Sequence, residues 1–288
     1  MSEKPQNVIL SGKVVVFVVG EAQAAFLKAP KKPKEGQKEE EKEETLLPAA
    51  PAYIGVLPVQ KAIKSENVKL AGLDAKLLVK SYAPNFVIAE VIFDLPDILS
   101  HQIWDYKKEA VAICQKTLVD YKTDKEFYEE YAVYCVSNYE SDPEVFLAWF
   151  GDKIAPLLKS EKVALDDKEI SETLNFNIKY AKNDLTIVDW DGAFVFNPLG
   201  RFEQNIELFE LTNFELLKLR KLDAALDQYL DKIYKLLRRR PKRFMFGMRE
   251  MRGIITEIIK MRTEALSDYD SIEKNFKLIC DWYTARLN

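Results

Sequence analysis

The chain has 288 residues, a hydrophobic fraction of 48%, a charged fraction of 31% and a formal net charge of −4 at pH 7. This length can bury a sizeable core in one large domain or two modest ones, and the composition is that of a globular protein with a heavily charged surface. The single histidine, His101, excludes a histidine-rich metal site. The net charge by itself argues neither for nor against a nucleic-acid partner.

The N-terminal segment raises the question of a targeting signal. Lys13 precedes the apolar run 14–19, and 22–24 has the A-x-A form of a signal-peptidase site. The run is short and ends at Gly20 and Glu21, so a buried strand explains it better. Since no stretch of about 18 apolar residues occurs, the sequence predicts no transmembrane helix.

Three cysteines, Cys114, Cys135 and Cys280, show no metal-ligand spacing. The sequence therefore predicts reduced, buried thiols in a reducing compartment, and we expect a cytoplasmic protein.

The first two hundred residues alternate between strand and helix patterns. Strands are predicted at 8–10 and 13–19, and then at 53–63, 76–81 and 86–93, the last being nearly continuous in apolar residues and so interior. Between them, 28–51 begins with six lysines and six glutamates in eighteen residues, which predicts a disordered charged linker. A helix is expected to open at Pro96-Asp97 and to run to about 119.

Two N-cap signals and a hairpin signal follow. A strand at 131–136 precedes Asp142-Pro143, which predicts a capped helix over 143–158. Asp166 with Glu169 resembles the capping box of a short helix. The dipeptide Asp191-Gly192 lies between strands at 185–190 and 193–196 and predicts a type I′ turn.

The longest element predicted is a helix over 201–240, which contains no Gly or Pro. At 100° per residue one apolar stripe forms, and its second part alternates spacings of three and four, as in a coiled-coil seam. Further helices at about 254–266 and 270–287 would fold back on it as an antiparallel bundle. The stripe comprises Leu208, Leu211, Leu219, Leu222, Leu226, Tyr229, Ile233, Leu236 and Leu237.

Charged residues interrupt or flank this stripe. Glu215 falls inside it, which predicts either an ion pair, such as with an arginine, or a raised pKa. Beside it lies a polar seam, in which Arg220 and Asp223 can meet on the helix surface. Such a seam fixes the register of a neighbouring helix or lines a ligand groove, and we favour register. The seam consists of Glu210, Asn213, Arg220, Asp223 and Asp227.

An acidic group is the candidate for metal-dependent chemistry. Asp184, Asp189 and Asp191 surround the hairpin, and Asp189 and Asp191 would share a strand face. With Glu210 they could hold Mg²⁺. The alternative is turn chemistry, with Asp191 chosen for its tolerance of positive φ and Asp189 bonded to backbone donors or an arginine. A lone His101 is a weak candidate for a catalytic base.

A basic cluster follows the long helix. Arg238, Arg239, Arg240, Lys242 and Arg243 lie close to Phe244 and Phe246. They could bind the phosphates of RNA or of an anionic membrane surface, with the aromatic rings stacking on bases or inserting among headgroups. The alternative is that they complement the negative end of the helix dipole, with Pro241 ending the helix.

Two blocks, 174–198 and 207–230, resemble an uncharacterised prokaryotic protein family. In layout the chain is also distantly similar to the required-for-meiotic-nuclear-division family, which implies a mixed sheet followed by long helices. Members of that family end in a membrane anchor and have eukaryotic relatives associated with organelle translation, and the resemblance implies no catalytic residue. The residues that carry it are Tyr180, Asp184, Asp189, Trp190, Asp191, Glu210, Asn213, Leu216, Leu217, Arg220, Leu222 and Asp223.

The sequence thus predicts an α+β fold, with a mixed or antiparallel sheet domain and packed helices over 1–200 and a long-helix hairpin or bundle over 201–288. We expect a non-catalytic interaction or scaffold protein without a cofactor, which binds a second copy or another protein through the long helix. The alternatives are a Mg²⁺-dependent enzyme using the acidic group and an RNA- or anionic-surface binder using the basic cluster.

Overall fold

The computed structural model describes residues 10–22, 60–82, 85–139, 142–179, 182–238, 252–260 and 262–263. The predicted linker 28–51 and all but the last residue of the strand predicted at 8–10 lie outside these ranges. The chain divides into two compact units, of which the first combines 1–32 with 59–214 and the second combines 33–58 with 215–288.

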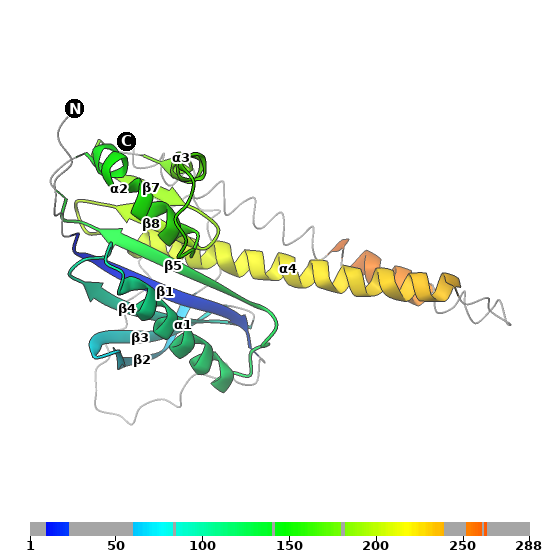
Figure 1. Ribbon diagram of the computed structural model, residues 1–288. Helices are drawn as coiled ribbons and strands as arrows, with labels where there is room; N and C mark the ends of the chain where they lie inside the picture. The colour runs from blue at the N-terminus through cyan, green and yellow to red at the C-terminus, as the bar shows by residue number, and fades with distance from the viewer. Residues whose placement is uncertain are drawn as a thin grey trace, which may run out of the picture. The chain divides into compact units, whose positions relative to one another are not determined.

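The first unit is built on one mixed eight-stranded sheet in the order β2-β3-β4-β1-β5-β8-β7-β6 (Figure 1). Neighbouring strands are antiparallel except for β5 and β8, which are parallel. This confirms the predicted α+β class. The strands are β1 (Gly12–Glu21), β2 (Gln60–Leu70), β3 (Leu73–Tyr82), β4 (Phe86–Leu95), β5 (Tyr128–Val136), β6 (Asn177–Ile178), β7 (Leu185–Val188) and β8 (Gly192–Phe196).

Strands β1 and β4 lie inside the sheet because both of their faces are apolar. Helices α1 (Ile103–Asp120) and α2 (Pro143–Leu158) contribute to the core on one face, and α3 (Asp167–Asn175) packs on α2. The prediction that α1 opens at Pro96-Asp97 was wrong. Residues 98–102 form turns instead, and the Asp97 carboxylate accepts a hydrogen bond from the Leu99 N–H at 3.1 Å.

Both predicted N-caps are present. The Asp142 carboxylate accepts from the Glu144 N–H at 3.3 Å at the start of α2. The Asp166 carboxylate accepts from the Lys168 N–H at 2.9 Å at the start of α3. Each carboxylate satisfies one backbone donor that has no partner within the helix.

The predicted type I′ turn at Asp191-Gly192 was wrong. Val188 pairs with Ala193, three residues (189–191) connect β7 and β8, and neither Asp191 nor Gly192 has a positive φ. Gly192 serves close packing instead, because a Cβ there would lie 3.0 Å from the carbonyl oxygen of Ala132 on the parallel strand β5. The dipeptide therefore reflects a strand contact rather than turn geometry.

A tighter contact lies at Gly12, where β1 begins. A Cβ at this position would lie 2.6 Å from the Cys135 carbonyl oxygen, which is backbone and cannot rotate away. We expect Gly12→Ala to lower the free energy of unfolding by about 1–3 kcal/mol, because the strands must separate locally. Urea denaturation measures the loss, and Ser11→Ala at the exposed neighbouring position serves as the control. Equal stability of the two variants would contradict the contact.

Helix α4 (Glu203–Arg238) has two apolar faces rather than the single stripe that the sequence predicted. In its first part, Ile206, Phe209 and Phe214 are buried, whereas Leu208 and Leu211 are only half-buried. At 100° per residue the stripe from Leu219 onward lies roughly 170° around the helix from this buried face. The prediction followed the leucines and missed the face that the aromatic side chains form.

The first face of α4 covers the side of the sheet opposite α1 and α2. The ring of Phe209 lies 5.6 Å from that of Tyr131 on β5, and the ring of Phe214 lies 4.3 Å from that of Phe86 on β4. In the second unit, residues 252–260 are helical, and Glu257 bonds to Tyr229 of α4. The predicted helix at 270–287 lies outside the described residues.

Candidate functional site

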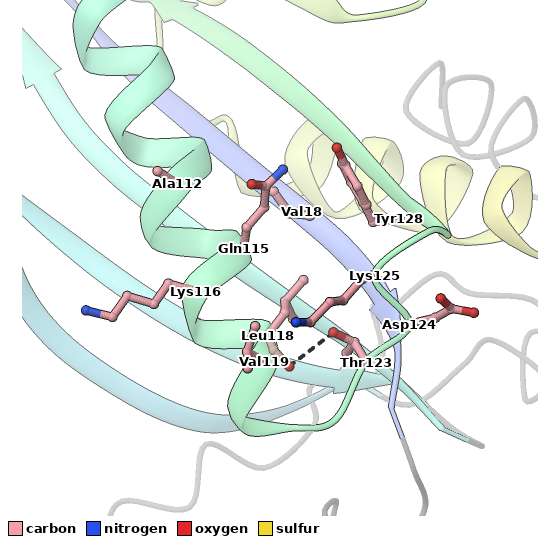
Figure 2. A pocket seen from close by; sticks show the side chains of 10 residues that line it. All are labelled: Val18, Ala112, Gln115, Lys116, Leu118, Val119, Thr123, Asp124, Lys125 and Tyr128. Carbon is pink, nitrogen blue, oxygen red and sulfur yellow. Dashed lines mark hydrogen bonds between the residues drawn. The ribbon is translucent and has the colours of Figure 1, made fainter.

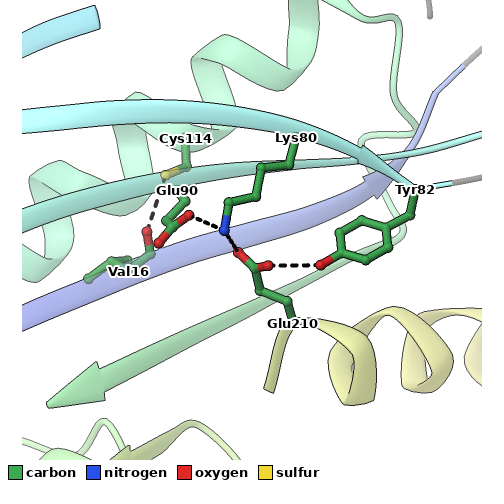
Figure 3. A network of polar contacts seen from close by, with 6 residues as sticks. All are labelled: Val16, Lys80, Tyr82, Glu90, Cys114 and Glu210. Carbon is green, nitrogen blue, oxygen red and sulfur yellow. Dashed lines mark hydrogen bonds and ion pairs between the residues drawn. The ribbon is translucent and has the colours of Figure 1, made fainter. Parts of the chain in front are cut away.

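The most deeply buried polar group of the described residues is a network between the sheet and the first part of α4 (Figure 3). The Lys80 ammonium of β3 lies 2.6 Å from a Glu90 carboxylate oxygen on β4 and 2.8 Å from a Glu210 carboxylate oxygen on α4. The Tyr82 hydroxyl donates to the other Glu210 oxygen at 2.9 Å. Glu210 is 0% exposed and Glu90 is 2% exposed. Two carboxylates are therefore buried next to one ammonium group and one phenol hydroxyl.

The surroundings of Glu210 raise its pKa. Burial raises the pKa of Glu210 to about 7, and the nearby Glu90 adds to this while Lys80 opposes it. For Lys80, burial alone would lower the pKa, but Glu210 and Glu90 outweigh it and raise the pKa above its usual 10.5. Burial and Glu210 also raise the pKa of Tyr82, which stays neutral. Chemically, the group can take up one proton near neutral pH.

The four carboxylates proposed for Mg²⁺ do not come together. The Glu210 carboxylate faces Lys80 and Tyr82, whereas an Asp189 oxygen lies 3.3 Å from the Lys159 ammonium, which also pairs with Glu169 at 2.7 Å. Among the described residues, which include all four carboxylates, no three His, Cys, Asp or Glu side chains form a group that could hold a metal ion.

The three aspartates take separate structural roles around β7 and β8. The Asp189 carboxylate also accepts from the Trp190 N–H at 2.8 Å, and its backbone carbonyl accepts from the Tyr131 hydroxyl at 3.0 Å. Burial raises the pKa of Asp191, and Lys107 opposes this rise. Asp184 precedes β7 and lies close enough to Tyr139 to add to the rise in its pKa, which is caused mainly by burial.

The residues of the polar seam are spread along α4. The Asn213 side chain is buried and donates to the Phe209 carbonyl at 2.9 Å. Glu215 is buried as well, and its carboxylate lies 3.3 Å from the Lys218 ammonium. An ion pair was predicted for Glu215, with an arginine as the example, and the structure forms one with a lysine three residues further along the helix.

Further along α4, Arg220 and Asp223 line a groove of about 410 Å³ together with Leu219, Leu222 and Leu226. Asp227 lies in the exposed part of the helix. The groove combines an apolar floor with one charge of each sign.

A second cavity of about 400 Å³ lies between the end of α1 and the loop that leads to β5 (Figure 2). Val18, Leu118 and Val119 form its apolar part, and Lys116 and Lys125 are among its charged side chains. None of the predicted site residues lines this cavity.

The predicted basic cluster lies almost wholly outside the described residues. Arg238 is the last residue of α4, and Arg239, Arg240, Lys242 and Arg243 follow it beyond the described part. Binding of RNA or an anionic surface there stays a prediction. Among the described helices, none is both long enough and apolar enough to span a bilayer.

Sequence reasoning missed Lys80, Tyr82 and Glu90, which surround the one residue of the network that it did select. One signal was available: Glu90 is the single charge within the apolar run 86–93, so an interior strand there required a buried partner for it. Lys80 gave no such signal, because its strand alternates and lysine is common on exposed faces.

The comparisons with known proteins agree with the resemblance to an uncharacterised family. A family model described as the N-terminal domain of uncharacterized protein MJ0711 matches residues 12–203. The uncharacterized protein MJ0711 of Methanocaldococcus jannaschii is 26% identical over 279 residues, which cover 97% of this chain and 80% of that protein. No solved structure matches the chain, and the comparisons do not show a link to the meiotic-nuclear-division family. Because the family model covers more than half of the chain, the chain belongs to the family defined by the N-terminal domain of uncharacterized protein MJ0711.

Proposed function

We propose that this protein is a non-catalytic interaction protein that self-associates, with the second part of α4 pairing with the same helix of a second copy. The observation that carries the proposal is the apolar stripe at Leu219, Leu222 and Leu226, which is partly open to solvent and precedes Tyr229, where Glu257 of the same chain contacts the helix. Leu219 is 42% exposed and Leu230, beside the stripe, is 49% exposed. Leu222 and Leu226 are half-buried. An apolar stripe at coiled-coil spacing that stays partly open to solvent is typical of an association surface.

The charges beside the stripe support a second copy in parallel orientation. With Leu219 and Leu222 as the two core positions of a heptad, Lys218 and Asp223 occupy the flanking positions. In a parallel pair of helices these positions face each other across the seam, so Lys218 of one copy would meet Asp223 of the other. In an antiparallel pair each charge would face its own kind.

We expect the molar mass from light scattering to rise toward that of a dimer as concentration increases. Leu226→Asp places a carboxylate in the middle of the stripe and should weaken dimerisation by roughly 100-fold, since both copies would bury it. Gln228→Asp introduces the same residue two positions away on an exposed face and should leave the dimer unchanged.

Circular dichroism of both variants checks that α4 stays helical. A wild-type chain that remains monomeric up to about 100 μM would overturn the proposal, because a seam of this length should associate below that concentration. Equal weakening by both substitutions would also contradict it, because the effect would then be on the helix rather than on one face.

We also propose a cytoplasmic location. Cys114 and Cys135 are both free and buried, which suits a reducing compartment. The distant similarity to the meiotic-nuclear-division family stays a prediction, supported by the shared order of a mixed sheet followed by a long helix.

A further inference from the structure

A buried lysine lies beneath a solvent-exposed serine where α2 ends. Lys107 is on the face of α1 that also carries the buried Ile103, Ala110 and Cys114, and it is 8% exposed. Its ammonium group donates a hydrogen bond to the Ser160 hydroxyl oxygen. The two residues are 53 positions apart in the chain, so the fold brings them together.

The end of α2 holds Ser160 in place. Ser160 has a φ of 54°, and the Glu161 N–H donates to the Pro156 carbonyl at 3.0 Å, which is the bond that closes a Schellman motif. Glycine is the usual residue at this left-handed position, because serine is strained there. A serine supplies what glycine lacks, namely a hydroxyl directed to Lys107.

Burial lowers the pKa of Lys107, and the nearby Glu130 and Asp191 only partly oppose this. A larger fraction of this amine is therefore neutral at a given pH than for an exposed lysine. A neutral amine can accept a proton, and its neighbour is a hydroxyl that has one to give.

We propose that Ser160 and Lys107 form a nucleophile–base pair that accepts acyl groups from activated esters. This goes beyond self-association through α4, and neither depends on the other. Ser160 Oγ attacks the ester carbonyl carbon while the Lys107 amine takes the hydroxyl proton, and the bond to the leaving alkoxide or phenoxide breaks. Lys107 then passes this proton to the leaving alkoxide, or to solvent when the leaving group is a stable phenoxide, and is neutral again. Water attacks the acyl-serine while Lys107 takes a proton from it, and that proton returns to Ser160 Oγ as the carboxylic acid leaves.

The arrangement leaves the nucleophile accessible and covers the base. Ser160 is exposed, so an ester can reach its hydroxyl, whereas Lys107 is buried. A purely structural role is the competing explanation, in which the Lys107 cation complements the negative end of α2. An arginine at 107 would preserve that role but cannot act as a base near neutral pH.

The test uses p-nitrophenyl acetate with the full-length protein. We expect a burst of p-nitrophenolate stoichiometric with the protein, and acetylation that peptide mass spectrometry places on Ser160. Ser160→Gly, which suits the left-handed backbone, should abolish the burst. Lys107→Arg should slow acylation by about 100-fold or more, the usual contribution of a general base, without loss of folded structure. The wild-type acylation rate should level off at a pH below the usual lysine value.

Ser137→Ala, at another exposed serine, is the matched control and should leave the burst unchanged. Absence of acetyl-Ser160 in the wild-type protein overturns the proposal, as does a burst that survives Ser160→Gly. Acylation at the wild-type rate in Lys107→Arg overturns the role of Lys107 as base and leaves it as a helix cap.

Discussion

Replacement of Lys80 by methionine is expected to lower the free energy of unfolding by about 3–5 kcal/mol at neutral pH. The Lys80 ammonium is the cation that lies between Glu90 and Glu210, and the substitution would leave two buried carboxylates without this cation. Methionine keeps the length of the side chain, so the loss reports on charge rather than on packing. Urea denaturation followed by tryptophan fluorescence measures it.

The matched control is Lys76→Met on the same strand, where the side chain is exposed and the change should stay within about 0.5 kcal/mol. A second variant tests whether unpaired buried charge causes this loss of stability. Combining Lys80→Met with Glu90→Leu and Glu210→Leu removes all three charges and should recover most of the stability, because well-packed apolar groups replace a buried ion network at little cost. If the triple variant is as unstable as Lys80→Met, unpaired charge does not explain the loss.

The secondary structure of the first unit was largely predictable because local physics sets most of it. The apolar run 14–19 became the centre of β1, the run 86–93 became most of β4, and Asp142 and Asp166 cap the helices that follow them. Each of these signals is contained within a few residues. The sequence does not contain the strand order, which depends on pairings such as β1 with β5 over more than a hundred positions.

The errors arose where one residue type serves two purposes. Gly192 was assigned to a turn, but close approach to β5 accounts for it, and both uses favour a residue without a Cβ. On α4, leucines outnumber aromatic residues. The prediction therefore followed the leucine stripe and did not detect the face formed by Ile206, Phe209 and Phe214. A helix that contacts different surfaces along its length carries two periodic patterns, and a single periodicity search finds the longer one.

The candidate site was less predictable than the fold. Glu210 was selected for a metal site, yet its partners Lys80, Tyr82 and Glu90 come from strands 120 or more positions earlier in the chain. Lys107 likewise meets Ser160 only after α1 and α2 have packed on the sheet. No pattern of spacing contains such contacts, because they depend on the topology of the sheet and not on neighbouring residues.

The second large effect expected from the Glu210 network is on the pH dependence of stability. The pKa of Glu210 is raised from 4.5 to about 7 by burial, so between these values the folded protein binds a proton that the unfolded chain has released. The contribution of Glu210 to the free energy of unfolding is therefore fully present below pH 4.5 and is lost as the pH rises toward 7. The loss is on the order of 3 kcal/mol. Lys80 has its pKa above 10.5 and stays charged throughout this window.

Glu210→Gln isolates this contribution, because glutamine keeps the shape and does not titrate. We expect urea denaturation to show that wild-type protein loses more stability between pH 5 and pH 8 than the variant does, by about 3 kcal/mol. Burial also raises the pKa of Glu207, so the variant should retain a smaller slope of the same sign. At pH 8 the variant should be at least as stable as wild type, since it carries one buried negative charge fewer beside Glu90. Identical pH slopes would mean that Glu210 is ionised in the folded protein at pH 5, and the network would then be a permanent ion cluster that holds α4 on the sheet at every pH in this range.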